Sequence, residues 1–220
     1  MYNSHVPYPF KFLIPATIIS ILAVFGLFNL GNRLLFLEIN KLINPYFSTF
    51  FKYYTHLGDG LTFVLVSLFF LFKQRKWFYL FSGTFLVSSG VSRICKDIIF
   101  TNSPRPVKFF EMEGLTIQTI EGLTTHQWNS FPSGHSITVF AMCTILAAYI
   151  RRGWMSIFIS VAAVTAAFSR VYLAQHFVLD VLAGTWIGIF SAFIVLYVVN
   201  SGIKVGKMSQ AEKSLIFNRS

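Results

Sequence analysis

The sequence predicts an all-α membrane protein with six transmembrane helices, folded as one domain over residues 1–220. Hydrophobic residues make up 55% of the chain and charged residues only 12%, which is far from the composition of a soluble domain. Apolar segments of about 20 residues, the length that crosses a bilayer as a helix, recur along the chain. Because no linker-like, low-complexity or repeated segment divides it, we expect a single helical bundle.

Six apolar windows define the expected helices: 12–31, 57–73, 77–100, 133–150, 154–173 and 178–200. The first is longer than a signal-peptide core and lacks a small-x-small cleavage site, so we expect it to be a retained span. The second is short and begins in Leu57-Gly58-Asp59-Gly60, which predicts an interfacial first turn. The aromatic stretch before it, Tyr46 to Tyr54, is typical of a segment lying in the headgroup region.

The basic residues predict the orientation, because short cytoplasmic loops carry an excess of Lys and Arg. One side of the predicted bundle collects Lys11, Lys73, Arg75, Lys76, Arg151, Arg152, Lys204, Lys207, Lys213 and Arg219. Glu212 is the only acid on that side, and the other seven of the eight acids lie opposite. We therefore expect both termini to be cytoplasmic and the loops 101–132 and 169–180 to face outward together.

The formal net charge of +10 could indicate a nucleic-acid partner. The cations are instead dispersed over loops and tail, without the basic helix or aromatic platform of a nucleic-acid binder. This distribution favours anionic lipid as the partner, and no obligate protein partner is evident.

Three polar clusters lie on the predicted outer side. They are Lys96 with Arg105-Pro106, then Pro132-Ser133-Gly134-His135, and finally Ser169-Arg170 with His176 and Asp180. A charge at the centre of a membrane helix costs roughly 2.5 to 3.5 kcal/mol on insertion scales, so charges at these positions indicate a function.

Lys96 alone is typical of a lysine that snorkels from a helix end. The segment Thr101-Asn102-Ser103-Pro104 predicts a turn that brings Arg105 back toward Lys96. Two cations converging there would form an anion site.

Pro132-Ser133-Gly134-His135 predicts a helix start, since Pro is favoured in the first helical turn. The backbone N–H groups of Ser133, Gly134 and His135 would be unpaired and, with the helix dipole, would cradle a phosphate. The alternative is an ordinary capped helix with an unrelated histidine.

If the last helix includes both His176 and Asp180, their side chains share a face. Asp180 can then accept from one ring nitrogen of His176 and leave the other free as a nucleophile or base. The structural alternative is an ion pair of Arg170 with Asp180 at the membrane boundary, with His176 as filler.

Together the three clusters resemble the type 2 phosphatidic acid phosphatase (PAP2) family of lipid phosphate phosphatases, which shares a site with vanadium haloperoxidases. The resemblance spans Lys96 to Asp180 and implies the helical core of that group. The second and third motifs match fully. The first departs, because eight residues rather than the usual six separate Lys96 from Arg105; we expect the turn at 100–104 to absorb the surplus.

The resemblance implies phosphate ester hydrolysis through a phosphohistidine. His176 would attack phosphorus with Asp180 orienting its ring, and His135 would protonate the departing oxygen and then activate water. The phosphate oxygens would be held by Lys96, Arg105, Arg170 and the amides of Ser133 and Gly134. Ser169 would either position Arg170 or contact the phosphate. Because fixed cations and amides stabilise the charge, we expect neither a metal nor a cofactor.

A site at the outer headgroup level implies a lipid substrate whose tails stay in the bilayer. The candidates are envelope lipids of a bacterial inner membrane: lipid A, undecaprenyl diphosphate, phosphatidylglycerophosphate or phosphatidic acid, with lipid A slightly ahead. The loop from Val107 to Phe131 would supply a rim that selects the headgroup, or simply be solvated. Its candidate rim residues are Glu111, Glu113, Glu121, His126 and Trp128.

Two other classes of function stay open. A vanadate-dependent haloperoxidase would use the same anion site, although a six-span body argues against it. A transporter or non-catalytic protein would bind a lipid phosphate without turning it over.

Overall fold

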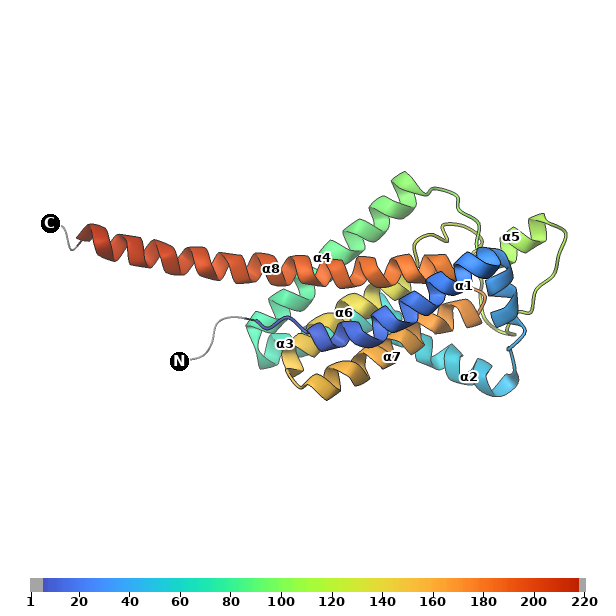
Figure 1. Cartoon of the computed structure of the whole chain (residues 1–220), viewed down its shortest axis with the longest axis horizontal. Coiled ribbons are helices and arrows are strands. Elements are labelled where there is room, and N and C mark those ends of the chain that lie inside the picture. The colour runs from blue at the N-terminus through green and yellow to red at the C-terminus, as the bar shows by residue number, and fades with distance from the viewer. Residues whose placement is uncertain (1–5, 218–220) are drawn as a thin grey trace.

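All regular elements in the described part of the chain are helices, which confirms the predicted all-α class (Figure 1). The computed structural model describes the backbone of residues 6–217 and the side chains of residues 6–202. The α-helices are α1 (Leu13–Asn40), α2 (Pro45–Tyr54), α3 (Gly60–Lys73), α4 (Arg75–Ile94), α5 (Pro106–Met112), α6 (Gly134–Ile150), α7 (Gly153–Tyr172) and α8 (Val178–Phe217). Three short segments complete the set: η1 (Phe10–Phe12), η2 (Thr55–Gly58) and the π-helical η3 (Cys95–Ile99).

Each of the six predicted windows coincides with a helix, but fewer qualify as membrane spans. By length and composition alone, the spans Phe10–Asn40, Gly153–Tyr172 and Val178–Gly202 can cross a bilayer. A fourth is added if the pair Pro45–Gly58 and Gly60–Lys73, bent by 51°, counts as one span. The structure therefore supports a membrane-embedded helical protein with three or four qualifying spans among the described residues.

The helix α6 lies at the centre of the bundle and packs against α4, α7 and α8. It is buried on nearly every side, as expected for a helix that is hydrophobic all round. Two glycines of α8 let its backbone approach α6 closely: a Cβ at Gly184 would lie 2.6 Å from the Ser133 carbonyl oxygen, and one at Gly188 would overlap the Ile137 carbonyl oxygen. This small-xxx-small spacing is a common way to bring membrane helices together.

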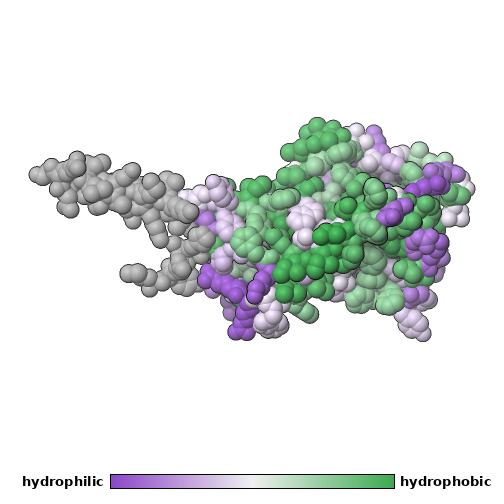
Figure 2. Space-filling model, viewed as in Figure 1, coloured by the Kyte–Doolittle hydropathy of each residue, from purple (hydrophilic) through white to green (hydrophobic). Residues whose placement is uncertain are grey.

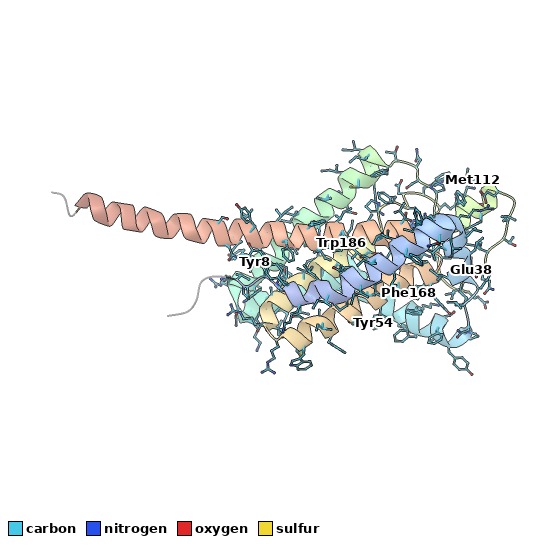
Figure 3. All side chains as sticks on the ribbon, viewed as in Figure 1. Tyr8, Glu38, Tyr54, Met112, Phe168 and Trp186 are labelled. Atoms are coloured by element: carbon cyan, nitrogen blue, oxygen red, sulfur yellow. The ribbon has the colours of Figure 1, made fainter. Side chains whose placement is uncertain are left out.

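The two ends of the bundle are polar and its middle is apolar. Figure 2 shows hydrophilic residues at both ends and hydrophobic surface between them, and Figure 3 labels Tyr8 and Glu38 at opposite ends. Lys11 lies against Gly153, and Lys76 interacts electrostatically with Arg151, so these basic residues share one end as expected. The tail cations from Lys204 onward, which also entered the orientation prediction, lie outside the described side chains.

The first helix continues past its predicted end at residue 31. Its backbone breaks at Gly31, which has φ 70° and ψ 169°, a conformation open mainly to glycine. The arm beyond the break packs on α5 and on the turn between α7 and α8. Phe36 stacks on Phe110 with ring centroids 5.6 Å apart and meets Phe177 edge-on at 5.3 Å. The arm therefore covers the segment that carries His176.

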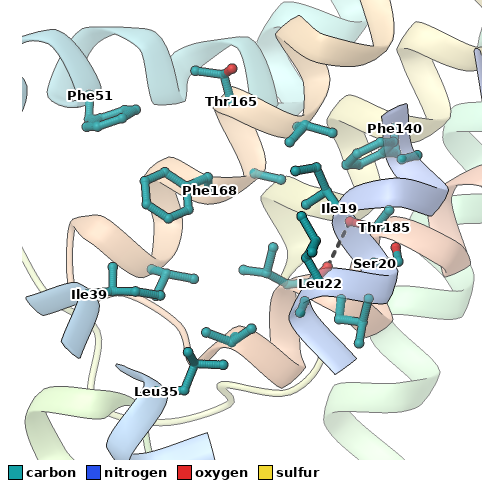
Figure 4. A pocket seen from close by; sticks show the side chains of 18 residues that line it. Ile19, Ser20, Leu22, Leu35, Ile39, Phe51, Phe140, Thr165, Phe168 and Thr185 are labelled. Carbon is teal, nitrogen blue, oxygen red and sulfur yellow. Dashed lines mark hydrogen bonds between the residues drawn. The ribbon is translucent and has the colours of Figure 1, made fainter. Parts of the chain in front are cut away.

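A cavity of about 540 Å³ lies among α1, α7 and α8. Figure 4 shows Ile19, Leu22 and Phe168 among the side chains that line it. Only Ser20, Thr165 and Thr185 interrupt its apolar lining, and no charged residue borders it. A phosphate group would find no positively charged side chain in this cavity. The three polar clusters therefore define a different site.

Candidate active site

The turn between α7 and α8 places His176 in the interior. The Arg170 carbonyl oxygen accepts from the backbone N–H of both Gln175 (2.9 Å) and His176 (3.1 Å), and Ala174 takes a positive φ of 54°. The chain thereby reverses directly after α7 and points the His176 ring inward. The residue is only 1% exposed.

Asp180 lies beside His176, although not by the predicted helical pairing. The helix α8 begins at Val178, as the predicted window did, so His176 precedes it and the condition that one helix includes both residues is not met. Asp180 instead caps the helix: its Oδ2 accepts from the Phe177 backbone N–H at 3.0 Å, the return half of a capping box. The same oxygen lies 3.4 Å from the Nδ1 of His176 and accepts from the Ser130 hydroxyl at 2.5 Å.

Arg170 is buried and only partly paired. Its Nη1 donates to the Thr55 hydroxyl at 2.8 Å, and its buried Nε has no hydrogen-bond partner among the described side chains. The alternative of an Arg170–Asp180 ion pair is not formed within that part of the chain. A buried guanidinium with an unused donor is suited to an anion, because an unsatisfied buried donor is costly.

The start of α6 matches the expected motif with one difference. Ser133 is the N-cap, and its hydroxyl accepts from the Ser136 backbone N–H at 3.4 Å. Its own N–H, expected to be unpaired, donates to the Asp180 carbonyl oxygen at 3.0 Å. The Gly134 and His135 amides occupy the first helical turn, where no carbonyl of the same helix can reach them. Pro132 precedes the cap rather than occupying the first helical position.

Lys96 reaches this helix start despite the longer spacing to Arg105. The π-helical segment η3 carries Lys96, and its wider turn, closed by the Phe100 N–H on the Cys95 carbonyl at 2.8 Å, absorbs part of the surplus. The Nζ of Lys96 donates to the Asn129 carbonyl at 3.1 Å. It lies 3.9 Å from where a Cβ of Gly134 would be.

Arg105 precedes α5 and is buried where the loop between η3 and α6 meets the α7–α8 turn. Its Nε donates to the Trp128 carbonyl at 3.1 Å, and its Nη1 approaches the backbone and side-chain oxygens of Gln175 at 3.4 Å. These contacts connect the guanidinium to Gln175, which directly precedes His176.

The cations converge on His176. Burial, followed by the positive charges of Arg105, Arg170 and Lys96, holds the pKa of His176 well below its ordinary value. A neutral imidazole keeps a lone pair available, which is what a nucleophile or base needs.

The remaining predicted residues are placed differently. The Ser169 hydroxyl donates to the Ala166 carbonyl one turn back, at 2.6 Å, which favours neither role expected for it. Among the proposed rim residues, Glu111 pairs with Lys108 and Glu113 with Arg33. Among the described residues, no group of three or more His, Cys, Asp and Glu side chains is placed to hold a metal ion.

The segment before α3 contributes two contacts to the site that the sequence did not predict. Asp59 pairs with the Nε2 of His135 at 2.6 Å, and Thr55 accepts from Arg170. The signal available was Leu57-Gly58-Asp59-Gly60, which we interpreted only as an interfacial turn. Ser130 was missed as well, since nothing in the sequence pairs it with Asp180.

A second cavity, of about 520 Å³, opens beside His135. It lies between α3, α4 and α6, and its lining includes Phe85, Ser92, Arg93 and Gly134. A group bound near His135 therefore has space for a large substituent, in contrast to the buried His176.

These features define a helical membrane protein in which buried cationic side chains gather near two histidines. The chain belongs to the PAP2 superfamily, whose family model matches residues 77–204.

Curated relatives match shorter stretches. The lipid A 4'-phosphatase of Bacteroides thetaiotaomicron is 34% identical over 32% of this chain and 31% of its own length. Phosphatidylglycerophosphatase B of Bacillus subtilis is 36% identical over 30% of this chain and 37% of its own length. The undecaprenyl-diphosphatase of Sulfolobus acidocaldarius is 33% identical over 39% of this chain and 40% of its own length. The matches thus span well under half of each of these relatives.

Two solved structures share the fold. LpxE of Aquifex aeolicus superimposes with a TM-score of 0.65 at 25% identity, over 74% of this chain and 93% of that one. A PAP2-type phosphatidylglycerolphosphate phosphatase from Bacillus subtilis reaches a TM-score of 0.55 at 22% identity, over 83% and 92%.

Proposed function

We propose that this protein is a lipid phosphate phosphatase that works through a phosphohistidine on His176. The observation that carries the proposal is the buried His176 ring, flanked by Asp180 and surrounded by Arg105, Arg170 and Lys96. A neutral nucleophile next to three fixed cations is suited to attack on a phosphate dianion, because phosphoryl transfer depends mostly on positioning and charge stabilisation.

In the first step, the Nε2 lone pair of His176 forms a bond to phosphorus. The bond from phosphorus to the ester oxygen breaks, its electron pair stays on that oxygen, and His135 supplies the proton. Asp180 stabilises the positive charge that develops on the His176 ring.

In the second step, His135 takes a proton from water as the water oxygen bonds to phosphorus. The N–P bond breaks with its electron pair returning to His176, and inorganic phosphate leaves. Lys96, Arg105, Arg170 and the Gly134 amide hold the non-bridging oxygens throughout. No step requires a metal ion.

The cavity beside His135 supports a large leaving group, such as the glycerol or sugar portion of a lipid. We propose an envelope lipid as substrate, drawn from lipid A, undecaprenyl diphosphate, phosphatidylglycerophosphate and phosphatidic acid, because the named relatives act on three of these classes. The protein would form one domain of six spans in the bacterial inner membrane, with both termini cytoplasmic and the site facing outward.

Phosphate release from these four lipids by the purified protein tests the proposal. We expect release from at least one lipid, its inhibition by vanadate, and its loss in His176→Ala. A protein that binds the lipids without turnover would be a carrier, and halide oxidation dependent on added vanadate would indicate a haloperoxidase. Wild-type turnover by His176→Ala would also overturn the proposal.

A further inference from the structure

The carboxylate of Asp59 lies between two imidazole rings. Its Oδ1 is 2.6 Å from the Nε2 of His135, and its Oδ2 is 2.6 Å from the Nδ1 of His56. Asp59 joins η2 to α3 and is the N-cap of α3, so the start of that helix fixes its backbone. His56 holds the second oxygen, which leaves the carboxylate little freedom to turn away from His135.

The backbone of the same turn touches His135 directly. A Cβ at Gly58 would lie 3.0 Å from the carbonyl oxygen of His135 and 3.1 Å from its Cβ. A side chain at this position would require His135 to shift by a few tenths of an ångström. Thr55, at the start of the turn, accepts from Arg170. One short segment, Thr55 to Gly60, therefore braces groups from both α6 and α7.

We propose that Asp59 is the positioning residue for the general acid His135. This inference rests on the proposed phosphatase function and adds a fourth motif, Thr55-His56-Leu57-Gly58-Asp59-Gly60, to the three predicted clusters. By accepting a hydrogen bond from the Nε2–H of His135, Asp59 fixes the ring and leaves Nδ1 to exchange a proton with the ester oxygen and then with water.

Electrostatics explains why the acid needs such a partner. Burial acts against a proton on His135, as do the charges of Arg170 and Arg105, whereas Asp59 favours the proton through its charge and its hydrogen bond. Asp59 therefore opposes the loss of the His135 proton that burial and the two guanidinium groups promote. In this scheme Asp180 supports the nucleophile and Asp59 supports the acid, one carboxylate for each histidine.

The proton count closes within the cycle. His135 gives its Nδ1 proton to the departing oxygen and regains one from the attacking water, while the Nε2 proton stays shared with Asp59. His56 supplies no proton and serves to hold Asp59. These roles predict that the loss of Asp59 lowers activity most for substrates whose leaving group needs a proton.

The test compares Asp59→Asn with wild type on two substrates, short-chain phosphatidic acid and p-nitrophenyl phosphate. The first releases an alcohol that needs protonation, and the second a phenolate that departs without it. We expect kcat/KM for the lipid to fall by about 100-fold and that for the aryl ester by less than about tenfold, since kcat/KM covers the steps up to leaving-group departure. Glu38→Gln, which removes an exposed carboxylate paired with Lys41, should match wild type on both.

A second readout uses the dephosphorylation step. Because His135 must also activate water, Asp59→Asn should give a burst of p-nitrophenolate followed by slow turnover. Asp59→Glu, which keeps a carboxylate, should recover part of the lipid activity and keeps the test valid if Asp59→Asn does not fold. Equal losses on both substrates, or Asp59→Glu no better than Asp59→Asn in folded protein, would overturn the inference.

The same experiment separates this inference from the proposed function. If wild type hydrolyses the lipid and His176→Ala does not, yet Asp59→Asn matches wild type, only the role of Asp59 fails. If wild type hydrolyses neither substrate, the proposed function fails with it.

Discussion

The Ser130 hydroxyl donates to Asp180 at 2.5 Å, on the oxygen that lies 3.4 Å from the Nδ1 of His176. The loop before α6 thus contributes a donor to the same carboxylate oxygen that faces the proposed nucleophile. Ser130 is 2% exposed and Asp180 4%, so water does not substitute readily for either partner.

Ser130→Ala should lower both stability and turnover. The buried Asp180 carboxylate loses a donor, which costs about 1.5 to 3 kcal/mol for a hydrogen bond to a charged group. Because the carboxylate is then less firmly fixed, kcat should fall while KM changes little. Thermal unfolding and steady-state kinetics measure the two effects. Ser156→Ala, whose hydroxyl donates to the Arg152 carbonyl in its own helix, is the control and should keep wild-type kinetics.

The stability of the protein should fall as the pH drops below about 6.5. The pKa of His176 is held well below its ordinary 6.5 by burial and then by neighbouring cations. Below that ordinary value the unfolded chain binds a proton at this ring and the folded protein does not, so stability decreases by about 1.4 kcal/mol per pH unit. His176→Gln should remove part of this decrease in a thermal-shift series from pH 7.5 to 5.5, because burial and the nearby cations act against a proton on His135 as well. The exposed His126→Gln should not, and an unchanged slope in His176→Gln would count against a buried neutral ring.

Arg170→Lys should reduce kcat/KM by about 100-fold, in the range seen when one donor to a developing oxyanion is removed. Lysine keeps the charge but cannot bond Thr55 and also present the donor that Nε offers. Arg33→Lys, at an exposed ion pair with Glu113, is the matched control. Comparable activity of the two variants would exclude Arg170 from phosphate binding.

Gly184→Ala should destabilise the bundle. Its new Cβ would lie 2.6 Å from the Ser133 carbonyl oxygen, so α8 must move away from α6 and separate Asp180 from the start of α6. Gly202→Ala meets nothing within 4 Å and should be neutral or stabilising by up to about 1 kcal/mol, because alanine favours helix over glycine. Thermal unfolding of the two variants in the same detergent checks this contrast.

Chelation should leave turnover unchanged. In the proposed scheme, Lys96, Arg105 and Arg170 would supply the positive charge that a metal ion provides in many phosphoryl-transfer enzymes. Phosphate release measured with EDTA, and again after adding magnesium, tests this. Activity that disappears with EDTA and returns with magnesium would contradict the scheme.

The positions of the helices and the convergence of the three clusters were predictable, because hydrophobic periodicity and motif composition are local properties of the chain. The break at Gly31 and the arm beyond it were not. Asn32 and Arg33 directly follow the break, and the direction of the arm beyond them depends on Phe36 packing against Phe110 and Phe177.

The partners of the predicted site residues were less accessible to sequence reasoning. Asp59 and His135 are far apart in the chain, and their pairing depends on how the start of α3 packs against α6. The Ser133 amide was expected to face phosphate, but the close approach of α6 and α8 gives it the Asp180 carbonyl instead. Such contacts arise from tertiary packing and leave no local pattern.

Trapping the phosphoenzyme tests the central claim most directly. The full-length protein is mixed with p-nitrophenyl phosphate, quenched in base, where phosphohistidine survives, and mapped by mass spectrometry after digestion. We predict one phosphoryl group on the peptide that carries His176, more of it in Asp59→Asn than in wild type, and none in His176→Ala. A phosphoryl group on another residue, or turnover by wild type and Asp59→Asn without any phosphoenzyme, would contradict the account.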